Sequence, residues 1–174
     1  MIKLSDGFMK VEKKYILSKE VAEKKMLRMA YEILENNTDE KEIILAGIRE
    51  SGSVVAKMIQ KMLAAISHFK IEYMTIILDK KNPEEIILSC PADFNGKTII
   101  VIDDVSNSGK TLLYALKPFL AYHPKKIQTL VLVERTHASF PVRPDYVGLS
   151  IATTLLEHIF VEVEGDEICG AYLQ

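Results

Sequence analysis

A run of apolar, mostly β-branched residues from Thr98 to Ile102 is followed at once by two aspartates, Asp103 and Asp104. Such a run predicts a strand that is buried on both faces, as in a parallel sheet covered by helices. The next residues, V-S-N-S-G-K-T at 105–111, predict a tight loop that opens a helix. We therefore expect a strand–loop–helix unit with two carboxylates at the carboxyl end of the strand, where such sheets bind ligands.

These residue types suit one class of ligand. Two adjacent carboxylates can accept hydrogen bonds from a vicinal diol, and the N–H groups of a loop at a helix start can hold a phosphate. The pattern therefore favours a sugar phosphate, although acidic residues and glycine after a strand also occur as ordinary turn chemistry. The G-K-T ending is not a nucleoside triphosphate loop, because that motif needs glycine where Asp104 stands.

The rest of the chain alternates helix and strand patterns. Residues 18–34 predict a helix capped by Ser18, and a second unit has a strand at 42–46, a loop at 47–52 and a helix to 66. Further strands are expected at 71–78, 85–90 and 127–133. Leu112, Leu116, Phe119 and Leu120 would share one face of the helix after Gly109, which Pro118 should kink or end early. We expect an α/β fold with a mainly parallel twisted sheet and helices on both faces.

The carboxyl-terminal part has a different pattern. Residues 134–174 lack a clear helix period and predict an irregular cap with late strands at 159–164 and 168–173. A length of 174 residues suits one domain, 1–174, with a core at 18–133 and a cap at 134–174.

Composition excludes several classes of protein. The 22 basic and 24 acidic residues give a net charge of −2, which is no polyanion-binding signature but leaves a local basic patch open. Cys90 and Cys169 form no C-x-x-C motif, so we expect buried, reduced thiols in a cytoplasmic protein. There is no leader pattern and no apolar run of 18 residues, which argues against secretion and membrane spanning.

Two segments carry a resemblance to a known family. V-I-D-D-V-S-N-S-G-K-T at 101–111 resembles the phosphoribosyl-diphosphate signature of type I phosphoribosyltransferases. The block 131–154, V-L-V-E-R-T-H-A-S-F-P-V-R-P-D-Y-V-G-L-S-I-A-T-T, looks like the corresponding segment of pyrimidine operon attenuator/uracil phosphoribosyltransferases. The resemblance covers most of residues 40–164, and the second block is the more specific.

The resemblance implies a reaction and a set of site residues. In the family, a base displaces pyrophosphate from C1 of magnesium-bound phosphoribosyl diphosphate. Asp103 and Asp104 would hold the ribose hydroxyls, directly or through magnesium-bound water, and would form the catalytic set with Arg49. The 5′-phosphate loop would comprise Val105, Ser106, Asn107, Ser108, Gly109, Lys110 and Thr111. The pyrophosphate loop would comprise Gly47, Ile48, Arg49, Glu50, Ser51 and Gly52. The base site would comprise Arg135, His137, Tyr146, Val147, Gly148 and Ile151.

The chain departs from the family pattern at several positions. The usual pyrophosphate loop G-I-K-T-R-G reads G-I-R-E-S-G, so Glu50 adds a carboxylate that would weaken pyrophosphate binding if it pointed inward. The Tyr-Arg pair and the long flap that the family has after the strand equivalent to 71–78 are missing, and Lys80 or Lys81 could replace that arginine. The family's R-G-H-R reads R-T-H-A at 135–138 and loses an arginine.

These features leave three functions open. The first is a phosphoribosyltransferase that acts on a pyrimidine, with uracil as the expected base and Mg²⁺ as cofactor. The second is a catalytically weak nucleotide sensor that binds leader RNA of pyrimidine biosynthesis genes, and the third is a related enzyme with another base. The expected partners are phosphoribosyl diphosphate, a pyrimidine base or nucleotide, and a second copy of the chain in a homodimer or larger homo-oligomer.

Overall fold

A computed structural model describes residues 13–154 and 157–174. Its main sheet has six strands in the order β4-β3-β2-β5-β6-β7, and only β4 runs antiparallel to its neighbour. The expected fold class is therefore confirmed. The strands are β2 (Glu42–Ile48), β3 (Lys70–Leu78), β4 (Ile86–Leu88), β5 (Thr98–Ser106), β6 (Lys126–Arg135) and β7 (Tyr146–Ile151).

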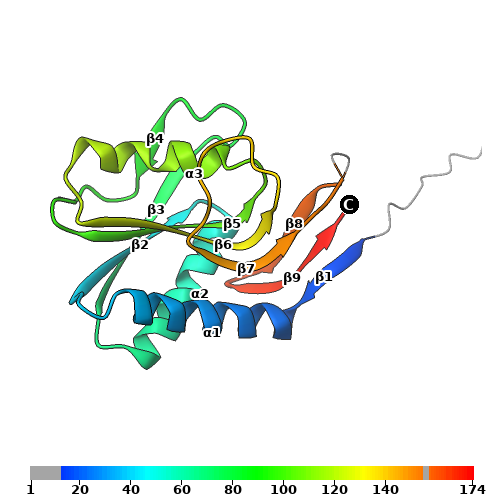
Figure 1. Cartoon of the computed structure of the whole chain (residues 1–174), viewed down its shortest axis with the longest axis horizontal. Helices are drawn as coiled ribbons and strands as arrows, with labels where there is room; N and C mark the ends of the chain where they lie inside the picture. Colours follow the sequence, from blue (N-terminus) through cyan, green and yellow to red (C-terminus); the bar gives the residue numbers. More distant parts are fainter. Residues whose placement is uncertain (1–12, 155–156) are drawn as a thin grey trace, which may run out of the picture.

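Helices cover both faces of this sheet (Figure 1). α1 (Lys19–Asn36) and α2 (Ser51–Ile66) pack on one face, and α3 (Lys110–Ala115) with the 3-10 helix η1 (Lys117–Ala121) packs on the other. α1 begins where the sequence predicts, because the Ser18 side chain accepts a hydrogen bond from the Val21 N–H at 3.3 Å. Its apolar face, which includes Met26 and Ile33, is fully buried.

The helix that follows Gly109 ends early, as Pro118 predicts. The chain changes from α-helix to 3-10 helix at Lys117, and this change alters the rotation per residue. Phe119 therefore stays buried and packs edge-on against Phe94, with ring centroids 4.9 Å apart. Leu120, which we expected on the same face, is 70% exposed, so that prediction is wrong.

A second sheet of three antiparallel strands lies at one end of the molecule (Figure 1). Its order is β1-β9-β8, formed by β1 (Lys14–Ser18), β8 (Ile159–Glu164) and β9 (Glu167–Leu173). β8 and β9 confirm the two late strands. The cap segment also contributes β7 to the main sheet, and β1 precedes the expected core; the sequence pattern predicts neither strand.

The two cysteines are placed differently from expectation. Cys90 is exposed, because β4 ends at Leu88 and the chain has left the sheet before the cysteine. Cys169 is partly exposed on β9, with its Sγ 3.8 Å from Glu164 Oε2. The prediction that both thiols are buried is therefore wrong. Within residues 13–154 and 157–174, no helix is both long and apolar enough to cross a membrane.

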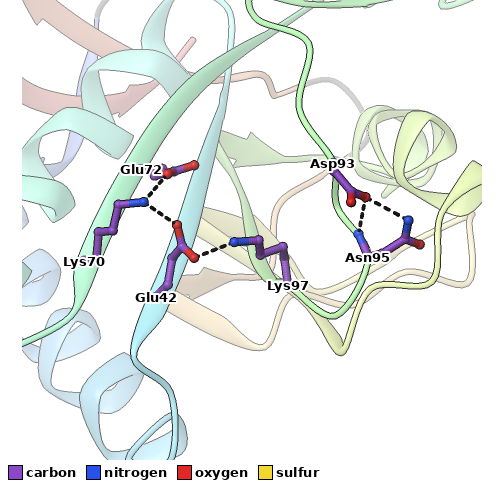
Figure 2. Close-up of polar contacts among 6 residues, drawn as sticks. All are labelled: Glu42, Lys70, Glu72, Asp93, Asn95 and Lys97. Atoms are coloured by element: carbon purple, nitrogen blue, oxygen red, sulfur yellow. Dashed lines mark hydrogen bonds and ion pairs between the residues drawn. The ribbon is translucent and has the colours of Figure 1, made fainter.

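Ion pairs join the amino ends of three neighbouring strands (Figure 2). Glu42, the first residue of β2, accepts hydrogen bonds from Lys70 of β3 and from Lys97, which precedes β5. Lys70 also donates to Glu72 at 2.7 Å, and Asp93 accepts from Asn95 on the connection before β5. These contacts hold the amino ends of the strands together, and sheets of this kind bind ligands at the opposite, carboxyl edge.

Candidate functional site

The acid pair lies within the central strand. β5 runs to Ser106, four residues beyond the predicted strand end. Asp103 and Asp104 therefore lie within the strand, near its carboxyl end. The Asp103 side chain is 1% exposed and the Asp104 side chain 13%. A Cβ atom on Gly52 would lie 2.9 Å from Asp103 Oδ1, which places this carboxylate against the first turn of α2. Only glycine leaves room for the carboxylate at that point.

A lysine from another strand connection binds both carboxylates. Lys80, which follows β3, places its Nζ 2.9 Å from Asp103 Oδ1 and 3.2 Å from Asp104 Oδ1. Asp103 Oδ1 also accepts the Asp104 N–H at 2.9 Å, whereas Asp103 Oδ2 is buried without a hydrogen-bond partner. One ammonium group therefore faces two carboxylates, and one buried acceptor remains unsatisfied.

Burial and charge act in opposite directions at this pair. Burial, and then the neighbouring Asp104 charge, raise the pKa of Asp103 well above its ordinary value, against the pull of Lys80. Burial alone would lower the pKa of Lys80, but the two carboxylates overcome it and raise that pKa. Lys80 is thus positively charged, and the acid pair would gain from a further positive charge.

A cavity of about 400 Å³ lies in front of the acid pair. The predicted 5′-phosphate loop forms one wall, and β8 of the small sheet forms another. The hollow that an anion needs is therefore present beside the carboxylates. The lining residues include Ser51, Lys80, Asp104, the whole of 105–112, Ile159, Phe160 and Val161.

Glycine and backbone hydrogen bonds hold the phosphate loop in place. Gly109 has φ 81°, a left-handed conformation that favours glycine, and a Cβ there would lie 2.9 Å from the Val142 carbonyl oxygen. The Ser108 carbonyl accepts N–H bonds from Ser139 and Phe140 at 3.0 and 2.9 Å. The loop is thereby fastened to the segment that follows β6.

The predicted pyrophosphate loop is divided among three elements. Gly47 and Ile48 end β2, Arg49 and Glu50 form an exposed turn, and the last two residues begin α2. Glu50 is the only non-glycine described residue with positive φ, at 71° with ψ −123°, a conformation that is costly for an L-residue. The Glu50 side chain is exposed. Of the six residues, Ser51 lines the cavity.

The predicted base-binding residues fall into two groups. Arg135 and Ile151 are paired neighbours at the carboxyl ends of β6 and β7. A smaller cavity of about 170 Å³ is lined there by Ser106, Arg135 and Ser150, among others, and Ser106 also lines the main cavity. His137 lies in the exposed segment after β6.

In the second group, polar groups bond to α1 or to its cap residue Asn37 instead. Tyr146 is 2% exposed, and its hydroxyl accepts a hydrogen bond from Asn37 Nδ2 at 3.3 Å. The Val147 and Gly148 carbonyls accept from Arg28 at 2.7 and 3.2 Å. These three residues line neither of the two cavities.

Sequence reasoning missed part of this site. The sequence indicates Lys80 only as a substitute for an arginine, because its bond to the acid pair depends on strand order, which the sequence does not state. Phe160 and its neighbours on β8 were predicted as strand residues without a role. The alternating pattern at 159–164 could identify the strand, but nothing in it indicates that β8 reaches the phosphate loop.

The chain matches a known protein family over most of its length. The phosphoribosyl transferase domain matches residues 14–167. The chain belongs to the phosphoribosyltransferase family. The resemblance seen in the sequence is thereby confirmed, since curated relatives include the bifunctional protein PyrR of Streptococcus uberis, 33% identical over 158 residues that cover 88% of this chain and 91% of that protein. The PyrR protein of Streptococcus sanguinis is 36% identical over 141 residues, covering 78% of this chain and 82% of the relative.

Solved phosphoribosyltransferase structures share the fold. The hypoxanthine phosphoribosyltransferase of Trypanosoma cruzi superposes with a TM-score of 0.76 at 15% identity, covering 92% of this chain and 95% of the other. A hypoxanthine-guanine phosphoribosyltransferase of Bacillus anthracis gives 0.71 at 20% identity, with 91% and 96% covered. At such identities the likeness concerns the fold alone.

Proposed function

We propose that the protein transfers the phosphoribosyl group from phosphoribosyl diphosphate to a pyrimidine base, with uracil as the favoured base, and releases pyrophosphate. The observation that carries this proposal is the cavity in which Asp104, Lys80 and loop 106–111 converge. Family membership and the PyrR relatives support it. A homodimer or larger homo-oligomer belongs to the same proposal.

Different residues of the cavity would bind different parts of the ligand. Loop 106–111 would bind the 5′-phosphate through its N–H groups and through the Ser108 and Thr111 hydroxyls. Asp104, at the cavity wall, would accept a hydrogen bond from a ribose hydroxyl, and the charge of the acid pair would stabilise the positive charge that develops at C1. Asp103 is too buried to face the sugar freely, so its part is to position its neighbour, whose N–H it accepts at 2.9 Å.

Magnesium fits the donor set of this site. The acid pair offers carboxylate oxygens, the ligands that Mg²⁺ prefers, and one of them is a buried oxygen without a partner. Within the described residues, no cluster of three or more His, Cys, Asp or Glu side chains could hold a metal ion. Asp103 and Asp104 would therefore hold the ion in part, directly or through water, together with oxygens of the substrate. When bound, Mg²⁺ supplies positive charge to the diphosphate.

Other residues would serve the leaving group and the base. Arg49, exposed in the turn after β2, is the cation proposed for pyrophosphate. We propose Arg135, His137 and Ile151 for the base, since Arg135 and Ile151 end adjacent strands beside the phosphate loop. We leave Tyr146, Val147 and Gly148 out of the proposal because their polar groups are bonded to α1.

The central experiment measures pyrophosphate release from phosphoribosyl diphosphate and uracil. Asp104→Asn should lower turnover by about 10²-fold, the scale of losing one electrostatic contact to the transition state. Asp39→Asn is the matched control, because Asp39 is exposed in the turn after α1. Absence of pyrophosphate release with uracil, cytosine, hypoxanthine and guanine would refute the proposed activity.

A second function is favoured by the PyrR relatives, which are named bifunctional proteins. We propose that the chain also binds leader RNA of pyrimidine biosynthesis genes and responds there to a nucleotide. RNA contacts with phosphates must weaken steeply as salt rises. Filter binding of such an RNA at 50 and 200 mM salt tests this, and a lack of retention at low salt would refute it.

A further inference from the structure

We propose that Lys80 is a built-in counter-cation of the acid pair, which occupies both carboxylates in the ligand-free protein and leaves them when a divalent cation binds. The inference rests on the proposed function in one respect, because it concerns the regulation of that same site. In this proposal, the Lys80 ammonium and a divalent cation compete for the carboxylate oxygens of Asp103 and Asp104.

The path of the lysine side chain shows that the contact is long-range. Lys80 follows β3, whereas the acid pair lies on β5, and β2 separates the two strands in the sheet. The side chain must therefore extend across the carboxyl end of β2 to reach both aspartates. It contacts Oδ1 of each, at 2.9 and 3.2 Å, so it bridges the pair from the cavity side.

The acid pair favours binding of a further cation, but that cation would compete with the Lys80 ammonium for the same carboxylate oxygens. A single ammonium faces two carboxyl groups, and Asp103 Oδ2 has no partner. A divalent cation held by Asp103 and Asp104 would lie within a few ångströms of the ammonium and repel it. A cation that binds through the Oδ1 atoms would therefore compete with the ammonium for them.

The lysine is free to move away. Its side chain is 43% exposed, although its ammonium is bonded to carboxylates that are almost fully buried. It also lines the main cavity, so a change of rotamer keeps its charge within the site after it leaves the acid pair. Lys80 therefore tunes metal affinity in the free protein rather than serving only as a structural ion pair.

Titration with Mn²⁺, used in place of Mg²⁺ because its binding is visible by electron paramagnetic resonance, tests the competition directly. Lys80→Gln should lower the Mn²⁺ dissociation constant at least tenfold, because a nearby positive charge is lost. Lys80→Arg keeps the charge and should stay within about threefold of wild type. Lys81→Gln is the matched control, since Lys81 is an exposed neighbour with no described contact to the acid pair. A Lys80→Gln dissociation constant equal to or above that of wild type would overturn the inference.

Thermal unfolding provides a second readout that needs no turnover. Without metal, Lys80→Gln should melt at a lower temperature than wild type, since the acid pair loses the one cation that contacts it among the described residues. Added Mg²⁺ should raise the Lys80→Gln midpoint by more than the wild-type midpoint. Equal Mg²⁺ shifts in the two proteins would contradict the competition.

The two proposals can fail separately. If wild type releases no pyrophosphate with any base while Lys80→Gln binds Mn²⁺ more tightly, the proposed enzymatic function fails and the counter-cation role stands. If wild type is active and Lys80→Gln binds Mn²⁺ no more tightly, the counter-cation role fails and the enzymatic function stands.

Discussion

Gly52→Ala is expected to destabilise the protein through the contact between α2 and the acid pair. The added Cβ would lie 2.9 Å from Asp103 Oδ1, 3.0 Å from Asp103 Cα and 3.0 Å from the Ile102 carbonyl oxygen. Two of these three atoms belong to the backbone of β5, so neither can yield without moving the central strand. Overpacking of this kind costs about 1–3 kcal/mol.

The gain that opposes this cost is smaller. Alanine is favoured over glycine inside a helix by about 0.5–1 kcal/mol, and Gly52 lies in the first turn of α2. Taking the middle of each range, the net loss should be about 1 kcal/mol in the free energy of unfolding, which lowers the melting temperature by about 2–4 °C for a chain of this size.

Urea and thermal unfolding followed by circular dichroism would measure this loss. Ser53→Ala is the control, because it improves the same helical turn without adding an atom, and its hydroxyl makes only a long contact of 3.4 Å with Ile48. Wild-type stability or better in Gly52→Ala would refute the reasoning, since it would mean that β5 accommodates the methyl group freely.

Two further predictions concern Glu42, at the start of β2, and Ser108, in the loop after β5. The Lys97 hydrogen bond, followed by that of a second lysine, lowers the pKa of Glu42 from 4.5 to about 2, so its stabilisation should be complete above pH 4.5 and be lost as pH falls towards 2. Glu42→Gln should reduce the difference between urea midpoints at pH 6 and pH 3, and an unchanged difference would argue against this. Ser108→Ala should weaken ribose 5-phosphate binding about tenfold by calorimetry, because a hydrogen bond to a charged group contributes about 1.5–3 kcal/mol; equal affinity would exclude a hydroxyl contact.

Local patterns predicted the elements that carry the site. The apolar run before Asp103 identified the central strand, because a strand buried on both faces needs continuous apolar residues. The helical spacing of apolar residues and the capping residue Ser18 predicted the first helix, and Pro118 predicted the early end of α3. In each case the deciding information lies within a few residues of the element.

The features that were missed depend on contacts between distant residues. β7 is short and contains Gly148, where a Cβ would lie 2.4 Å from the Leu132 carbonyl oxygen, so the glycine reflects close packing against β6 rather than a turn. Lys80 reaches the acid pair only because of the strand order β3-β2-β5. Leu120 fits the helical period, yet it turns outward once the helix tightens.

The Ser108 carbonyl, bonded to the N–H groups of Ser139 and Phe140, joins two loops that would contact opposite ends of a nucleotide. A shift of the phosphate-side loop would strain these two hydrogen bonds to the segment that carries His137. Occupancy at one end should then order the other, so the two ligand fragments are expected to bind with positive cooperativity. Thermodynamic linkage makes this reciprocal: a base analogue should enhance ribose 5-phosphate binding by the same factor by which ribose 5-phosphate enhances binding of the analogue.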